Sequence, residues 1–171
     1  MKSKVYLVSL GNSEKVQVVA DKLKRLLEGS RVLNFIKLNN RVAVKMHFGE
    51  EGNTGFVKPQ YLRIICDKIT ALRAAAFISD TNTLYRGRRT NSIDHLALAR
   101  EHGFTLQATG AEIIVPDDSK KENVVEVPIN QKFIKAAKLA RLFVDADALV
   151  GVSHFKGHIM TGFGGALKNI G

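Results

Sequence analysis

The residues best suited to chemistry gather in the last part of the chain. Residues 153–171 hold two histidines, two lysines and several glycines, directly after an apolar run at residues 146–152. Imidazole and amine groups can move protons in a reaction. Glycines let the backbone turn sharply and approach a ligand closely. We therefore predict a site in this loop, with Lys156, His158 and Lys168 as its catalytic residues.

The glycines of this loop also suggest an anion-binding turn. Gly162, Gly164 and Gly165 precede a short helical pattern, and free backbone amides at a helix start favour a negative group. We predict that these glycines bind a small anionic ligand or cofactor together with Asn82 and Arg86, which lie in an earlier polar loop. The residue order of a P-loop is absent. The alternative is a tight turn in which the glycines only permit close packing.

Three expected strand ends carry groups that can bind a metal. His47, Asp80 and His154 each follow an apolar run. Because the carboxyl ends of parallel strands share one edge of a sheet, these side chains should converge there. Imidazole and carboxylate ligands suit zinc, nickel or iron. We predict a metal site formed by these three residues, and the alternative is that the histidines are hydrogen-bonded structural groups.

The elements that must position these residues alternate between strands and helices. This alternation predicts an α/β fold with a mostly parallel sheet flanked by helices in three layers. Strands are expected at residues 4–10, 41–48, 74–80, 112–115, 124–128 and 148–153. Helices are expected at residues 16–29, 59–72, 92–102 and 130–143.

Length and composition fit one domain of 171 residues with 45% hydrophobic residues. The only cysteine is Cys66, which we assign to the core of a helix face, so disulfides within the chain are excluded. No secretory signal or membrane span is evident, and we expect a cytoplasmic protein without membrane contact. The net charge of +10 suits an anionic partner, yet 7% aromatic residues and no tryptophan argue against nucleic acid. We assign Arg88 and Arg89 to solvated loop charge, and His95 to a structural role.

Four segments together resemble one known family. They are residues 45–53 (KMHFGEEGN), 80–89 (DTNTLYRGRR), 95–104 (HLALAREHGF) and 153–171 (SHFKGHIMTGFGGALKNIG). The chain resembles the N-terminal part of the uncharacterised iron–sulfur centre proteins, which contain domain of unknown function 362. The resemblance implies [4Fe–4S] clusters held by a ferredoxin-like segment of the full-length protein. We therefore expect residues 1–171 to be a single domain that ends before that segment.

A shorter stretch is similar to a second family. The order His158, residues 161–165 (TGFGG) and Lys168 is similar to a run in the nickel-pincer lactate racemases. That similarity implies an acid/base role for His158 and a cofactor anchor at Lys168. Gly164 stands where that family has a serine.

These observations lead to one function and two alternatives. The first is a redox or cofactor-handling enzyme domain that is associated with an iron–sulfur segment and has a site rich in His, Lys and Gly. One alternative is a non-enzymatic electron-transfer or scaffold module that docks a ferredoxin-like domain. The other is a site like that of the nickel-pincer racemases.

Overall fold

A four-stranded parallel sheet forms the centre of the protein. The computed structural model describes residues 2–170, and the strand order is β3-β2-β1-β6. All three neighbouring pairs of strands are parallel, and helices surround the sheet. This confirms the predicted three-layer α/β class. The strands are β1 (Arg41–Lys45), β2 (Ala75–Ser79), β3 (Glu112–Ile114) and β6 (Ala148–Gly151).

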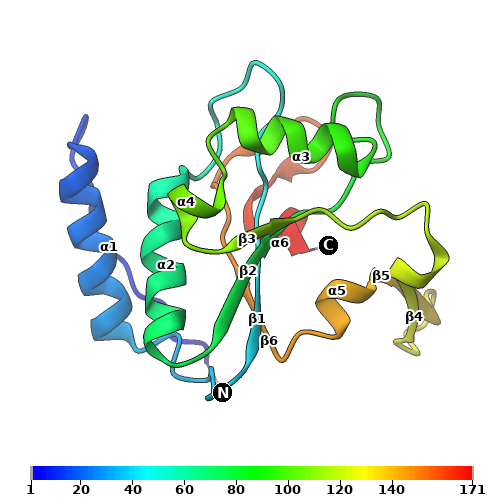
Figure 1. Ribbon diagram of the computed structural model, residues 1–171, viewed down its shortest axis with the longest axis horizontal. Coiled ribbons are helices and arrows are strands. Elements are labelled where there is room, and N and C mark those ends of the chain that lie inside the picture. The colour runs from blue at the N-terminus through cyan, green and yellow to red at the C-terminus, as the bar shows by residue number, and fades with distance from the viewer. Residues whose placement is uncertain (1, 171) are drawn as a thin grey trace.

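The helices and two small hairpins surround this sheet. Helices α1 and α2 lie on one side of it, and α5 and the hairpin β4–β5 lie on the other (Figure 1). The helices are α1 (Val16–Ser30), α2 (Pro59–Ala71), α3 (Ser92–Glu101), α4 (Leu106–Thr109), α5 (Arg141–Val144) and α6 (Gly165–Ile170), with a 3-10 turn η1 (Lys121–Asn123). The hairpins pair β4 (Val124–Pro128) with β5 (Ala136–Ala140), and β7 (Gly157–His158) with β8 (Gly162–Phe163).

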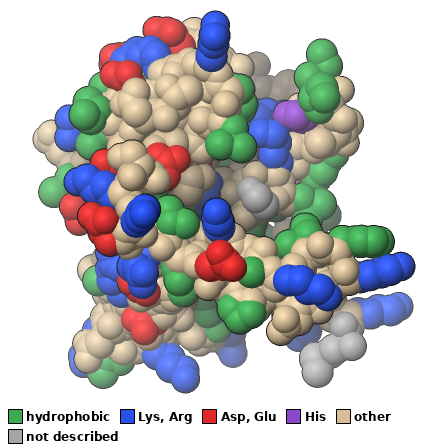
Figure 2. All heavy atoms as spheres, turned by 90° about the vertical axis from the view of Figure 1, so that its right-hand side faces the viewer, with side chains coloured by type: hydrophobic (Ala, Val, Ile, Leu, Met, Phe, Trp, Pro, Cys, Tyr) green, Lys and Arg blue, Asp and Glu red, His purple; other side chains and the backbone are tan. Residues whose placement is uncertain are grey.

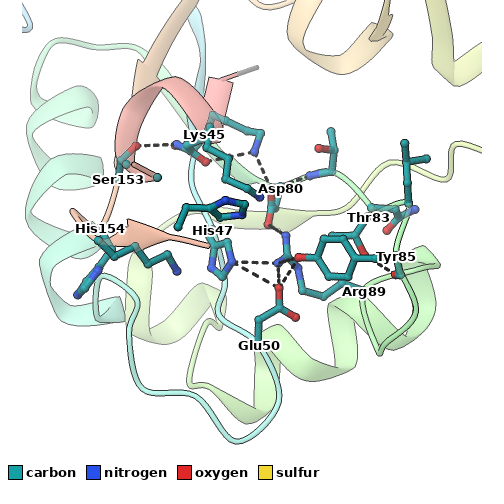
Figure 3. Close-up of a pocket in the computed structure, with 18 residues that line it drawn as sticks. Lys45, His47, Glu50, Asp80, Thr83, Tyr85, Arg89, Ser153 and His154 are labelled. Atoms are coloured by element: carbon teal, nitrogen blue, oxygen red, sulfur yellow. Dashed lines mark hydrogen bonds and ion pairs between the residues drawn. The ribbon is translucent and has the colours of Figure 1, made fainter. Parts of the chain in front are cut away.

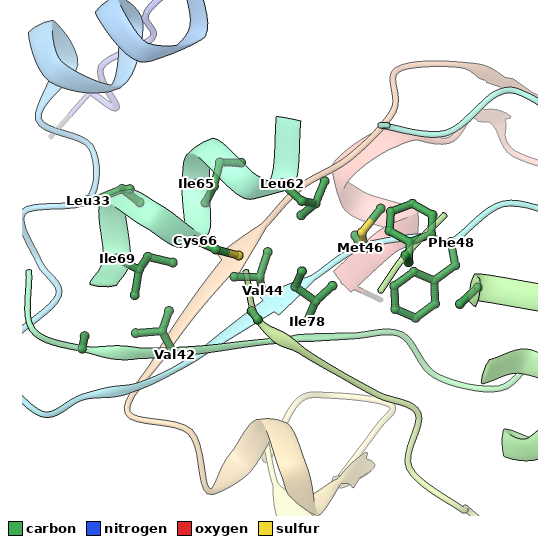
Figure 4. Packing of buried hydrophobic residues seen from close by; sticks show 14 of the residues in the cluster. Leu33, Val42, Val44, Met46, Phe48, Leu62, Ile65, Cys66, Ile69 and Ile78 are labelled. Atoms are coloured by element: carbon green, nitrogen blue, oxygen red, sulfur yellow. The ribbon is translucent and has the colours of Figure 1, made fainter. Parts of the chain in front are cut away.

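The core lies between β1 and α2 (Figure 4). Val42 and Val44 alternate along β1 toward this helix, and both are fully buried. Apolar residues of α2 recur at helical spacing and face them, and Pro59 suits the first turn of this helix because that position needs no amide hydrogen bond. Each such buried side chain stabilises the fold by about 1.5–3 kcal/mol. The buried face of α2 consists of Pro59, Leu62, Ile65, Cys66 and Ile69.

Two sequence predictions are wrong. Residues 4–10 form no strand, and none of the described strands pairs with them, so their apolar side chains remain exposed. The expected helix at residues 130–143 is instead the strand β5 followed by the one-turn helix α5. The alanine-rich segment favours a helix locally. It forms a strand instead, because antiparallel pairing with β4 satisfies the backbone hydrogen bonds of both segments.

The surface shows no single dominant feature on the side that carries the β4–β5 hairpin. Basic, acidic and hydrophobic side chains are interspersed there (Figure 2). Across residues 2–170, none of the helices combines the length and the apolar character that a membrane crossing requires.

Candidate functional site

A cavity of about 520 Å³ opens at the carboxyl ends of the parallel strands. The loops that follow β1, β2 and β6 converge on it, as the sequence predicted for His47, Asp80 and His154 (Figure 3). This is the edge at which open α/β sheets place their ligands. The lining consists of Lys45, His47, Glu50, residues 80–85, Arg89, Ser153, His154, Lys156, His158, Gly164, Gly165, Lys168 and Asn169.

Asp80 is the centre of a buried cluster that also contains Lys45, Arg89 and His95. Its Oδ1 lies 2.6 Å from Lys45 Nζ, and its Oδ2 lies 3.0 Å from Arg89 Nη2. Burial by itself would raise the pKa of Asp80, but the charges of Lys45 and Arg89 and the hydrogen bond from Lys45 outweigh it, so the pKa is well below its ordinary value. Asp80 is therefore a structural anion at neutral pH, and both of its oxygens are occupied.

Arg89 is held rigidly by this buried cluster. Its Nε donates to His95 Nε2 at 3.2 Å, and its Nη2 donates to Asp80. His95 is fully buried, and its Nδ1 lies 3.2 Å from Asn82 Oδ1, so it donates there and accepts from Arg89. Only Nη1 of the guanidinium remains to face Glu50, Tyr85 and His47 in the cavity.

Glu50 and Tyr85 close this side of the cavity. Tyr85 OH donates to Glu50 Oε1 at 2.6 Å, and Arg89 Nη1 donates to the same oxygen. Burial raises the pKa of Tyr85 to about 12, helped by this hydrogen bond. Burial would also raise the pKa of Glu50, but the Tyr85 hydrogen bond and the Arg89 charge lower it on balance. Glu50 is thus ionised and Tyr85 protonated at neutral pH.

His47 is neutral at physiological pH. Burial, with the nearby charges of Arg89 and Lys156, lowers its pKa to about 4. Its Nδ1 accepts the amide hydrogen of Gly49 at 2.9 Å, so the proton of the neutral ring lies on Nε2. That Nε2 lies 2.9 Å from Arg89 Nη1 and 3.7 Å from Glu50 Oε1.

The backbone at Gly49 explains how the loop after β1 brings His47 and Glu50 to the cavity. Gly49 has φ +98°, and an added Cβ would lie 2.5 Å from a ring carbon of Phe56. The Phe56 ring stacks on His102, whose Nδ1 contacts the carbonyl of Phe48 at 2.8 Å. The chain must therefore turn tightly at this position, and only glycine fits.

Residues 153–169, the C-terminal loop, form the opposite side of the cavity. Asn169 of α6 ties this loop to β1, because its amide donates to the Lys45 carbonyl and to Ser153 Oγ, both at 3.0 Å. The Gly164 amide donates to the Lys156 carbonyl at 2.9 Å. This amide is therefore already hydrogen-bonded within the protein and is not free for an anion. Glycine permits this close approach, because a Cβ at this position would lie 3.3 Å from the same carbonyl oxygen.

The cationic and histidine side chains of the C-terminal loop face the cavity more openly. Lys156 Nζ donates to the Gly55 carbonyl at 3.3 Å. Burial lowers the pKa of Lys156, and the charges of Arg89 and Lys168 lower it further against the opposing effect of Glu50. His158 lies in β7, where its Nδ1 accepts from two backbone amides, so its spacing from His154 is not that of a helical metal-binding pair.

Most of the predicted site residues line the cavity, and two do not. Arg86 is exposed and Gly162 is the first residue of β8, and neither contributes to the lining. Asn82 lines the cavity, but its side chain is already hydrogen-bonded to Ser92, Asp118 and His95. The residues that the structure places there as predicted are His47, Asp80, Asn82, His154, Lys156, His158, Gly164, Gly165 and Lys168.

Sequence reasoning left eight lining residues out of the site and misassigned a ninth. Arg89, expected in solvent, is almost entirely buried. The eight residues are Lys45, Glu50, Thr81, Thr83, Leu84, Tyr85, Ser153 and Asn169. A signal for Lys45 existed, since it is a charged residue at the carboxyl end of a strand whose preceding residues 42–44 are apolar. No local pattern distinguishes Arg89 from Arg88, which pairs with Glu101 at the surface.

The predicted metal site fits this arrangement poorly. Within residues 2–170, no three His, Cys, Asp or Glu side chains are grouped so that they could hold a metal ion. Asp80 already contacts the side chains of two cations, Lys45 and Arg89. The positive charge of Lys156 also lies near His47 and would oppose a metal cation there. Metal binding by His47, Asp80 and His154 stays a prediction that no observation of the structure supports.

The fold and cavity define an α/β protein with a polar, cation-rich cavity at the carboxyl edge of its sheet. Residues 42–170, which make up well over half of the chain, match the family described as domain of unknown function (DUF362). The chain therefore belongs to this family. No curated protein and no solved structure matches it.

Proposed function

We propose that this cavity binds a small anionic substrate or cofactor, and that the chain is the ligand-handling domain of an enzyme. The observation that carries the proposal is the charge of the lining. Four cationic side chains (Lys45, Arg89, Lys156 and Lys168) face two carboxylates, Glu50 and Asp80. Such an excess inside a recessed site attracts an anion more strongly than the same charges would on an open surface.

The chemistry that these residues can supply is positioning and proton transfer. Lys156 is partly desolvated, and its lowered pKa makes the neutral amine, which can act as a base, more accessible. His47 presents a neutral N–H that can donate to a ligand oxygen without carrying a charge. His158 and Lys168 lie on the same cavity, and so the racemase-like roles of acid/base group and cofactor anchor remain part of the proposal.

The test compares two lysine variants in calorimetric titrations with oxalate and with inorganic phosphate. Lys156→Met should weaken binding at least about tenfold, because it removes a charge-assisted contact worth about 1.5–3 kcal/mol. The matched control is Lys132→Met, an exposed lysine in the β4–β5 turn, which should bind as the wild type does. Equal loss in both variants, or none in either, would argue against a specific site in this cavity.

We also propose a redox setting, in which this domain works with a ferredoxin-like segment that carries [4Fe–4S] clusters. The resemblance of the four sequence segments supports this, and the membership of the family is compatible with it. Four cysteines are the ordinary ligand set of a cluster, and this chain has only the buried Cys66. The chain thus supplies no cluster site, and iron analysis of a longer gene product against this chain tests the association.

A further inference from the structure

One carboxylate in the cavity is placed where a ligand would be expected. Glu50 Oε1 accepts from Tyr85 OH at 2.6 Å and from Arg89 Nη1, and it lies 3.7 Å from His47 Nε2. These three donors come from two different loops and converge on a single oxygen (Figure 3). We call the place that Glu50 Oε1 occupies, next to these three donors, the acceptor position.

The acceptor position is anchored by Arg89, whose side chain has little freedom to move. Arg89 is 5% exposed at its side chain, and its Nε and Nη2 are committed to His95 and Asp80. Nη1 is therefore aimed into the cavity by the fold, independently of Glu50. An anion that binds there meets a donor that needs no reorganisation.

The contact between His47 and Arg89 gives a second reason to place an acceptor here. Nδ1 of His47 accepts from the Gly49 amide, so Nε2 carries the proton, yet it lies 2.9 Å from Arg89 Nη1. Two N–H groups that face each other repel unless both can reach an acceptor. In this structure the only such oxygen described near both is that of Glu50, which reaches Arg89 closely and His47 at a longer distance.

Glu50, in contrast to Arg89, is free to move away from this position. Its side chain is 36% exposed, and it lies on the loop after β1 between Gly49 and the exposed Glu51. A change of side-chain rotamer is enough to move its carboxylate into solvent. The position is thus rigid at Arg89 and mobile at Glu50.

We propose that the Glu50 carboxylate occupies the position of a ligand carboxylate, and that a small carboxylic acid binds in the cavity by displacing it. This rests on the proposed function, and it specifies the ligand class of that site. A carboxylate is favoured over phosphate because a carboxylate already satisfies these donors. Lys156 and Lys168 on the opposite side are placed for a second polar group of the ligand.

The occupied position weakens the apparent affinity of the ligand, because only the fraction of molecules with an open position can bind it. Glu50→Ala should therefore tighten oxalate binding by about tenfold in calorimetric titration, as expected if about a tenth of molecules are open. Glu51→Ala is the matched control, since Glu51 is on the same loop and its side chain pairs, among residues 2–170, with Arg88 alone, at 3.5 Å. It should change the affinity by less than about twofold.

Glu50→Asp separates occupancy from simple charge. It keeps the negative charge but shortens the side chain, so that it reaches the donors less well. Tightening of oxalate binding by Glu50→Asp, smaller than that by Glu50→Ala, would support displacement. Wild-type affinity in Glu50→Asp together with tightening in Glu50→Ala would overturn it, because charge alone would then explain the gain.

The remaining outcomes also decide between the proposals. Unchanged or weaker binding in Glu50→Ala, while Lys156→Met still weakens binding, would overturn the displacement and leave the anion site intact. A larger gain for inorganic phosphate than for oxalate would overturn the carboxylate assignment. If oxalate binds to neither the wild type nor Glu50→Ala, with both folded by urea denaturation, both proposals fail.

Discussion

The two sides of the cavity are built in opposite ways. The buried cluster (Lys45, Asp80, Arg89 and His95) has side chains that are 0–10% exposed and are bound to one another. The C-terminal loop (residues 153–169) is largely exposed, with Phe155 at 80% and Ile159 at 98% exposure. One side is fixed before any ligand arrives, and the other can adjust to it. In such a site the buried cluster positions a ligand, and the C-terminal loop adapts to it.

The largest effect is expected from breaking the buried cluster at Asp80. Asp80→Asn keeps the size of the side chain but leaves Lys45 and Arg89 buried without their shared anion. We expect a loss of about 3–5 kcal/mol in the free energy of unfolding, measured by urea denaturation. Asp67→Asn, which breaks an exposed pair with Arg63, is the control and should cost less than about 1 kcal/mol. Similar losses in the two variants would mean that the buried cluster contributes no more stability than an exposed ion pair.

A smaller effect is expected from His47 when the pH is lowered. The folded pKa of about 4 lies below the ordinary value of 6.5, so between these values the unfolded chain binds a proton that the folded chain does not. Stability should therefore fall as the pH drops from about 6.5 to 4, by up to about 3 kcal/mol. His47→Asn should remove this fall, as checked by denaturation at a series of pH values. The contribution of Asp80, whose pKa is lowered, is present above its ordinary pKa of 3.8 and is lost as the pH falls further.

The smallest effect on stability is expected from the C-terminal loop. A double change of His154 and His158 to alanine should shift the free energy of unfolding by less than about 1 kcal/mol, because these residues are not part of the core. It should nevertheless abolish binding of oxalate or a metal ion, as calorimetry can show. Unchanged binding in the folded double variant would remove these histidines from the site and leave the buried cluster as its working part.

The sequence revealed these two sides unequally. The histidines, lysines and glycines of the C-terminal loop are conspicuous by type and spacing, and parallel strands bring His47, Asp80 and His154 to one edge. Arg89 could not be assigned in this way, because its burial depends on His95 and Asp80, which meet it only in the folded chain. Residues 4–10 fail for a related reason, since a strand-like pattern describes a tendency, while pairing requires a free neighbour at the right place.

The buried thiol of Cys66 can report whether the protein is folded. It is the only cysteine of the sequence, it lies on the buried face of α2 with 1% exposure, and burial raises the pKa of its thiol to about 12. A thiol-specific reagent should therefore react only when the core opens. The labelling rate of each variant then separates a molecule that has lost its ligand from a molecule that has lost its fold, without any added probe.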